Sequence, residues 1–133
     1  NMRHTHFRDP TGLYKENKAS ARDLARLVSA AAKYPLIRQL TTTKSHRQKV
    51  GRNVLKFNNT NVLTKNPNWK IGLSKTGFIN ESGKCLVMQT WLKNRPMIIV
   101  LLNSWGALTP VGDSNRIKQW IRTVSLDDAQ KRG

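Results

Sequence analysis

The sequence predicts an α/β fold of the α+β kind, in which an antiparallel sheet is packed between helices. Three successive segments have the composition of β-strands: residues 69–76, 84–92 and 97–102. Connections of about four residues join them, which makes neighbouring strands antiparallel. The second and third segments are apolar on both faces, so their sheet needs cover on both sides. Helical patterns before and after the strands supply part of that cover.

The first helix is predicted to begin after Ser20, a favourable N-cap residue. Asp23 stands three residues further on, in the capping-box position. Pro35 ends this helix and allows a short second one over residues 36–40. The apolar residues of the first helix recur at helical spacing: Leu24, Leu27, Val28 and Ala31.

Residues 41–56 are polar and basic, and we expect an exposed excursion with weak strand character. Residues 57–68 are rich in Asn and are predicted to be loop. In the first of the three strands, alternation places Ile71, Leu73 and Lys75 on one face.

The last predicted helix has Asp113 as its N-cap candidate. Its apolar stripe consists of Ile117, Trp120, Ile121 and Val124. The four tryptophans fall at strand or helix positions, and we expect them in the core rather than as stacking platforms for nucleobases: Trp69, Trp91, Trp105 and Trp120.

The net charge of the chain indicates which classes of partner it could bind. Its 133 residues include 24 Lys and Arg but seven Asp and Glu, a formal net charge of +17. Such a charge usually indicates an anionic partner such as nucleic acid or a phospholipid surface. The basic residues are dispersed, however, and their longest adjacent runs are pairs, which fits a solvated surface at least as well. A basic nucleic-acid-binding module is therefore the alternative interpretation, and nucleic acid is not the partner we expect.

Metal and cofactor chemistry finds no support in the residue spacing. The histidines His4, His6 and His46, with the single cysteine Cys85, match no zinc pattern, and no intramolecular disulfide is possible. We expect no metal and no cofactor. No apolar run reaches the roughly 18 residues that a membrane span needs.

The organisation is that of part of a domain. Residues 1–126 are predicted to be the C-terminal portion of one domain, and residues 127–133 a frayed tail. The first residues, NMRHTHFRDPTGLY, have the character of the middle of a longer protein. Three central strands and about two substantial helices do not cover a sheet on both sides, so we expect the remaining cover upstream of Asn1.

The motif Lys75-Thr76-Gly77 lies on the first of the three strands. A lysine on an otherwise apolar face is costly unless it reaches polar surroundings, and snorkelling at a strand end is one explanation. The other is a binding site at the edge of the sheet. There the ammonium would bind a carboxylate, the Thr76 hydroxyl would add a hydrogen bond, and Gly77 would let the backbone of a peptide approach the strand.

The segment LSKTGFINESGKCLVM, with NTNVL and FRDPTGLYKENKASARDLARL before it, resembles the low-molecular-mass penicillin-binding proteins. The resemblance runs from about Met2 to Val124 and is strongest to the D-alanyl-D-alanine endopeptidases of the penicillin-binding protein 7/8 group. It implies a β-lactamase/transpeptidase-like fold, of which this chain supplies three central strands and the C-terminal helix. It also implies a serine-type endopeptidase or carboxypeptidase of the periplasm, acting on peptidoglycan stem peptides through an acyl-enzyme and inhibited by β-lactams.

The resemblance carries roles over to four residues. Lys75 and Thr76 would bind the terminal carboxylate of the substrate, Gly77 would complete the motif, and the backbone N–H of Phe78 would form half of the oxyanion hole. The nucleophile of the family is the serine of S-x-x-K, and a second serine lies in S-x-N. None of the eight serines in this chain has Lys three residues later or Asn two residues later. Thr41-Thr42-Thr43-Lys44 has the first spacing, but with Thr at its head and in the wrong order.

We therefore expect no catalytic residue in this chain, and we expect both serine motifs upstream of Asn1. The chain by itself is predicted to be inactive, and the N-terminal portion of the same protein is its expected partner. A non-catalytic fragment is a further alternative.

Overall fold

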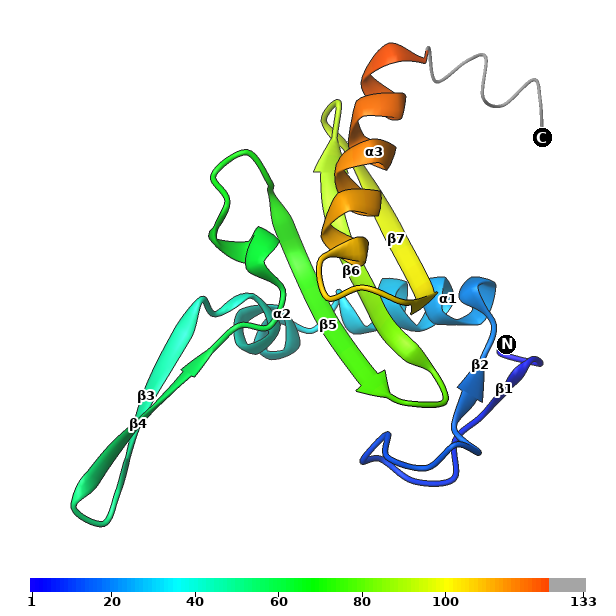
Figure 1. The fold of residues 1–133 in the computed structure, drawn as a ribbon. Helices are drawn as coiled ribbons and strands as arrows, with labels where there is room; N and C mark the ends of the chain where they lie inside the picture. The colour runs from blue at the N-terminus through cyan, green and yellow to red at the C-terminus, as the bar shows by residue number, and fades with distance from the viewer. Residues whose placement is uncertain (125–133) are drawn as a thin grey trace.

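The computed structural model describes residues 1–124, so the predicted tail at 127–133 lies outside the described residues. Its elements are β1 (Thr5–His6), β2 (Lys18–Ala19), α1 (Ala21–Ala31), α2 (Pro35–Thr42), β3 (Ser45–Val50), β4 (Asn53–Asn58), the 3₁₀ turn η1 (Val62–Lys65), β5 (Ile71–Ile79), β6 (Gly83–Leu92), β7 (Arg95–Ser104) and α3 (Thr109–Thr123). The main sheet has the order β5-β6-β7, with α3 in front of it and α1 and α2 behind it (Figure 1). The predicted fold class, an antiparallel sheet between helices, is confirmed.

The three strands of the main sheet pair antiparallel, as predicted, but they are joined by tighter turns. The connection between β6 and β7 has two residues, Lys93 and Asn94, both with positive φ (49° and 60°). Two such residues form the turn that matches the twist of a hairpin. The four-residue connection expected there is therefore too long, because Arg95 and Pro96 already belong to β7.

A β-bulge in β5 changes which residues share a face. Ile71 pairs with Thr90, whereas Leu73 pairs with Gln89. Successive residues of β6 point to opposite faces, so Ile71 and Leu73 do too. The prediction that Ile71, Leu73 and Lys75 share a face is wrong in its first member: Ile71 packs on the α3 side, and Lys75 follows Leu73 on the other.

The core between the sheet and α3 is built from strand residues and one side of the helix. Its fully buried members are Leu63, Trp69, Leu86, Met88, Leu92, Ile99 and Ile121, with Ile71, Met97, Leu101, Val111 and Ile117 packed against them. Of the four tryptophans expected in the core, Trp69 is buried and Trp91 is half-buried. Trp105 (96% exposed) and Trp120 (55% exposed) are not core residues, so the expectation is wrong for both.

Helix α3 begins four residues before the predicted N-cap. Pro110 stands in its first turn, a position where the missing N–H of proline costs nothing. Asp113 is consequently inside the helix, where it pairs with Arg116 instead of capping. The helix ends at Thr123, so Val124 follows the helix rather than extending its stripe.

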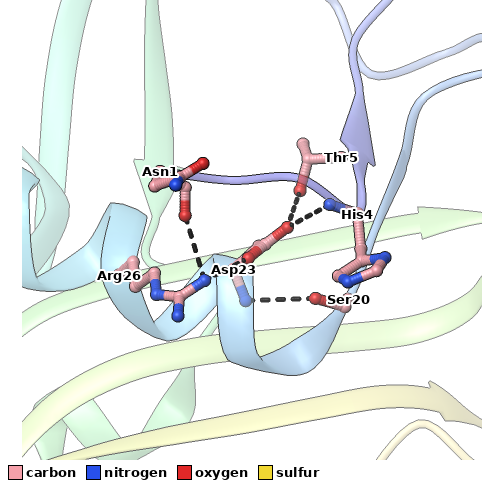
Figure 2. A network of polar contacts seen from close by, with 6 residues as sticks. All are labelled: Asn1, His4, Thr5, Ser20, Asp23 and Arg26. Carbon is pink, nitrogen blue, oxygen red and sulfur yellow. Dashed lines mark hydrogen bonds and ion pairs between the residues drawn. The ribbon is translucent and has the colours of Figure 1, made fainter.

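Helix α1 begins where predicted, with the Ser20 hydroxyl accepting from the Asp23 N–H at 3.2 Å. The carboxylate of Asp23 does not complete a capping box. It is fully buried and accepts from the His4 N–H at 2.8 Å, the Thr5 hydroxyl at 3.0 Å and the Arg26 guanidinium at 2.9 Å (Figure 2). Burial acts to raise the pKa of Asp23, but these hydrogen bonds and the charge of Arg26 outweigh it and hold the pKa below its ordinary value. Asp23 thus ties the N-terminal segment to α1.

The region between α2 and β5 confirms the prediction of an exposed excursion. Strands β3 and β4 form a hairpin that projects away from the main sheet, and every residue of both strands is exposed (Figure 1). Phe57 belongs to β4 rather than to the loop expected from residue 57 onward. None of the helices within residues 1–124 has the length and apolar character to cross a membrane.

Candidate functional site

Strand β5 forms one outer edge of the main sheet, because no other strand within residues 1–124 pairs with its far side. Lys75 and Gly77 are exposed and Thr76 is half-buried. An outer strand of this kind presents unpaired backbone N–H and C=O groups to which an extended peptide can add. The motif predicted from the sequence to lie at a sheet edge does lie at one.

Lys75 carries a charge that no carboxylate of the described chain neutralises. The ion pairs within residues 1–124 are Arg8–Glu16, Arg26–Asp23 and Arg116–Asp113. The ammonium of Lys75 instead donates to the backbone carbonyl of Thr76. This contact is local and exposed, so an incoming carboxylate can replace it with a charge-assisted hydrogen bond. The bulge at Gly72 contributes to this geometry, because it turns Lys75 away from the face of Ile71 and the α3 core.

Thr76 points its hydroxyl toward a second hydroxyl on the loop before η1. Its Oγ1 lies 2.5 Å from Oγ1 of Thr60, which is itself exposed. The next residue, Asn61, is buried and holds the loop against the sheet: its amide donates to Ser74 Oγ at 2.8 Å, and its Oδ1 accepts from the Leu63 N–H at 3.1 Å. Thr60 and Asn61 therefore position the loop beside the motif.

Thr60 and Asn61 were not predicted from the sequence to be site residues. The segment NTNVL, which contains both residues, supported only the resemblance to the family. The usable signal was Asn61, because an Asn side chain can accept from the backbone two residues on, as Asn61 does from the Leu63 N–H at the start of η1. What no local signal shows is that this loop lies beside residues 74–76.

Gly77 and Phe78 leave the end of the site open. A Cβ built on Gly77 would meet nothing within 4 Å, so the glycine keeps free space beside the strand. The Phe78 ring is 58% exposed, and the Lys84 ammonium lies over it at 4.1 Å from the ring centroid. This cation–π contact packs the Phe78 ring against Lys84 of the neighbouring strand β6, and the ring lines the hollow beside Gly77.

Two hollows adjoin this edge. One, of about 650 Å³, extends from Gly77 and Phe78 toward the loop at residues 10–13 and the start of α3. The other, of about 630 Å³, extends from Lys75 toward α2 and the base of the β3–β4 hairpin, where His46 and Phe57 line it. Lys75 and Thr76 line both hollows, so a ligand along the edge of β5 would have room on either side of the strand.

Beside the motif, the described residues include no serine of an S-x-x-K or S-x-N motif and no metal centre. Ser74 is buried, and its hydroxyl accepts from Asn61. Thr41, at the head of the misplaced T-x-x-K spacing, donates its hydroxyl to the Arg38 carbonyl in α2. Within residues 1–124, no cluster of His, Cys, Asp and Glu has the arrangement of a metal site. The arrangement of Lys75, Thr76 and Gly77 on an outer strand is suited to binding an anionic, extended ligand.

Residues 1–106 match the family model of the D-alanyl-D-alanine carboxypeptidases. The chain belongs to this family. The D-alanyl-D-alanine endopeptidases of Escherichia coli K12 and Pseudomonas aeruginosa are 43% and 42% identical to it over 124 residues, 92% of this chain. The resemblance to these endopeptidases, drawn from the sequence, is confirmed. The matches give no support to a nucleic-acid-binding module.

Solved structures agree on the fold. The Streptomyces K15 DD-transpeptidase superposes with a TM-score of 0.75 at 25% identity, over 87% of this chain and 47% of its own. A D-alanyl-D-alanine carboxypeptidase from Mycobacterium tuberculosis gives a TM-score of 0.69 at 22% identity, over 79% and 40%. The chain spans 40% of the length of the two endopeptidases named above.

Proposed function

We propose that the protein carrying this chain is a serine-type D-alanyl-D-alanine peptidase that cleaves peptidoglycan stem peptides in the periplasm, and that this chain supplies its substrate-binding edge. The observation that carries the proposal is the outer strand β5. There an ammonium that has no carboxylate partner within residues 1–124, a hydroxyl and an unobstructed glycine follow one another. Membership of the family supports the reaction class.

Binding follows from the geometry of the edge. The terminal carboxylate of the stem peptide accepts from Lys75 Nζ and from Thr76 Oγ1. To bind it, Lys75 gives up its hydrogen bond to the Thr76 carbonyl, and Thr76 gives up its hydrogen bond to the Thr60 hydroxyl. The peptide backbone lies along β5 as an added strand, in the space that Gly77 leaves open.

The acyl transfer needs groups from outside this chain. A serine hydroxyl attacks the peptide carbonyl, its proton passes to the leaving amine, and water then hydrolyses the ester. The backbone N–H of Phe78 donates to the oxyanion together with the N–H of the nucleophile; one such donor typically contributes about 10²–10³ in turnover. A β-lactam would acylate the same serine and remain attached as an inhibitor. We infer that the S-x-x-K and S-x-N serines lie on the N-terminal portion of the same protein.

Labelled penicillin tests the assignment. We expect no covalent adduct on residues 1–133 alone and an adduct on the longer protein that includes both serine motifs. In the longer protein, Lys75→Ala should slow acylation sharply without changing the far-UV circular dichroism, because the carboxylate of the β-lactam loses its cation. Lys33→Ala is the matched control, since Lys33 is exposed and lies on the α1 side of the fold. Acylation of Lys75→Ala at the rate of the control would refute the role of Lys75.

A further inference from the structure

The β3–β4 hairpin concentrates positive charge in a region without acidic residues. From Leu24 to Asn80 the sequence contains no Asp or Glu. The same stretch contains eleven cations: Arg26, Lys33, Arg38, Lys44, Arg47, Lys49, Arg52, Lys56, Lys65, Lys70 and Lys75. Five of these belong to the hairpin or its foot, and none of the five forms an ion pair within residues 1–124. The charge dispersed along the sequence is thus locally unopposed on one projecting element.

The strand register shows how the hairpin divides its residues. Arg47 pairs with Lys56 and Lys49 pairs with Val54, so these four side chains share one face. The other face carries His46 opposite Phe57 and Gln48 opposite Leu55, and Val50 opposite Asn53. Near the foot, His46 and Phe57 line the hollow beside Lys75, so this part of the hairpin belongs to the site already described. The tip, residues 49–54, does not.

The tip combines cations with exposed aliphatic side chains. Lys49 and Arg52 flank Val50 and Val54, which are 54% and 62% exposed. Gly51 takes a positive φ of 59° and closes the turn without a side chain. Figure 1 shows the tip as the point of the hairpin most distant from the main sheet. An exposed valine gains free energy when its apolar surface leaves water, as it does at the boundary between the headgroups and the acyl chains of a bilayer.

We propose that this tip docks on a bilayer surface bearing anionic phospholipid headgroups, with Val50 and Val54 inserted. Lys49 and Arg52 of the tip, and Arg47 next to the tip, would lie among the phosphates. Charge complementarity selects an anionic surface. The valines select a lipid over a nucleic acid, because binding of single strands relies on aromatic stacking and the tip has no aromatic residue. Docking would hold the edge of β5 close to the membrane, since the foot of the hairpin adjoins Lys75.

Vesicle co-sedimentation of the protein carrying this chain tests the proposal. We expect binding to vesicles of phosphatidylcholine with phosphatidylglycerol, and little binding to phosphatidylcholine alone. Each cation near such a surface contributes about fivefold in affinity, so Arg47→Gln, Lys49→Gln and Arg52→Gln together should lower it about a hundredfold. Val50→Ser with Val54→Ser, which keeps every charge, should lower it by about tenfold.

A matched control removes three exposed cations elsewhere: Arg3→Gln, Arg22→Gln and Lys33→Gln. An equal loss of affinity in this control would overturn the proposal, because the attraction would then come from the total charge. A fall in oligonucleotide binding with the tip cations, together with vesicle binding insensitive to the valines, would overturn it in favour of nucleic acid.

A dye at the tip gives a readout that does not depend on affinity. Asn53→Cys, in a Cys85→Ser background, carries a polarity-sensitive label between the two valines. Its emission should shift to the blue when anionic vesicles bind the protein. An emission typical of water while the protein is bound would refute insertion of the tip.

Discussion

Gly72 is the residue at which the structure makes its sharpest energetic prediction. A Cβ at this position would lie 2.6 Å from Cη2 and 2.7 Å from Cζ3 of Trp91, and 2.9 Å from Oε1 of Gln89. The Gln89 amide is the end of a flexible side chain and can move away. The indole is rigid and half-buried, with the Lys70 ammonium at 5.2 Å from its ring centroid, so Gly72→Ala must displace the ring or open the bulge.

The cost follows from two opposing effects. Overpacking of this kind costs about 1–3 kcal/mol. Alanine is better than glycine within a strand by roughly 0.5–1 kcal/mol, which offsets part of it. We expect Gly72→Ala to lower the free energy of unfolding by about 1–2 kcal/mol, and to shift the urea midpoint down by about 1 M. Urea unfolding followed by far-UV circular dichroism measures this without depending on tryptophan fluorescence.

Trp91→Phe provides the decisive background, since Cη2 and Cζ3 belong to the part of the indole that a phenyl ring does not reach. Gly72→Ala should cost little in the Trp91→Phe background, so the two substitutions should show a coupling energy of about 1 kcal/mol. An equal cost in both backgrounds would refute the steric argument. So would a Gly72→Ala protein as stable as the wild type.

Three further predictions concern the site, the core and the N-terminal network. Gly77→Ala should leave the free energy of unfolding unchanged or raise it by about 0.5 kcal/mol, because its Cβ meets nothing within 4 Å. In the longer protein that includes both serine motifs, the same substitution should slow β-lactam acylation by blocking the ligand backbone, and unchanged acylation would contradict the placement of the ligand. Met88→Ala should lower the free energy of unfolding, measured by chemical denaturation, by about 2–5 kcal/mol, because Met88 is completely buried between the sheet and α3. A loss below about 1 kcal/mol would mean that neighbouring side chains fill the space left by the methionine. Asp23 has a lowered pKa in the folded chain, so its stabilisation is complete above about pH 4 and is lost as the pH falls through the folded pKa. The stability advantage of wild type over Asp23→Asn should shrink below that pH in thermal unfolding, and an advantage that does not change with pH would contradict the network in Figure 2.

The sheet was predictable because long apolar runs between turn residues specify strands without reference to the rest of the chain. The residue at which α3 begins could not be predicted correctly. Asp113 has the preferred chemistry of an N-cap, but Pro110 already fits the first turn, and the helix begins at the earlier of the two signals. Trp120 sits next to Ile121 in sequence, and a step of one residue on a helix is enough to turn a side chain from the core to solvent.

In the candidate site, too, some features could be predicted from the sequence and others could not. The motif at 75–77 was recognisable from residue types and spacing, and an outer strand carries it. The bulge at Gly72 was not recognisable, because a single inserted residue leaves no mark on composition. Its effect is large nevertheless: residues before the bulge and residues after it no longer follow one alternation between the two faces of the sheet. The contact between Thr60 and Thr76 joins segments that only the folded chain brings together.

The two outer strands of the main sheet have a consequence for handling the chain in solution. Within the described residues, β5 and β7 each leave one long side without a strand partner, and β7 (Arg95–Ser104) is largely aliphatic. Such borders recruit strands from other molecules, which leads to self-association. The net charge of +17 opposes the approach of two copies at low ionic strength, whereas about 1 M salt shortens the range of that repulsion to roughly 3 Å. Raising the salt concentration, a common remedy for sticky basic proteins, should therefore turn monomers of residues 1–133 into oligomers.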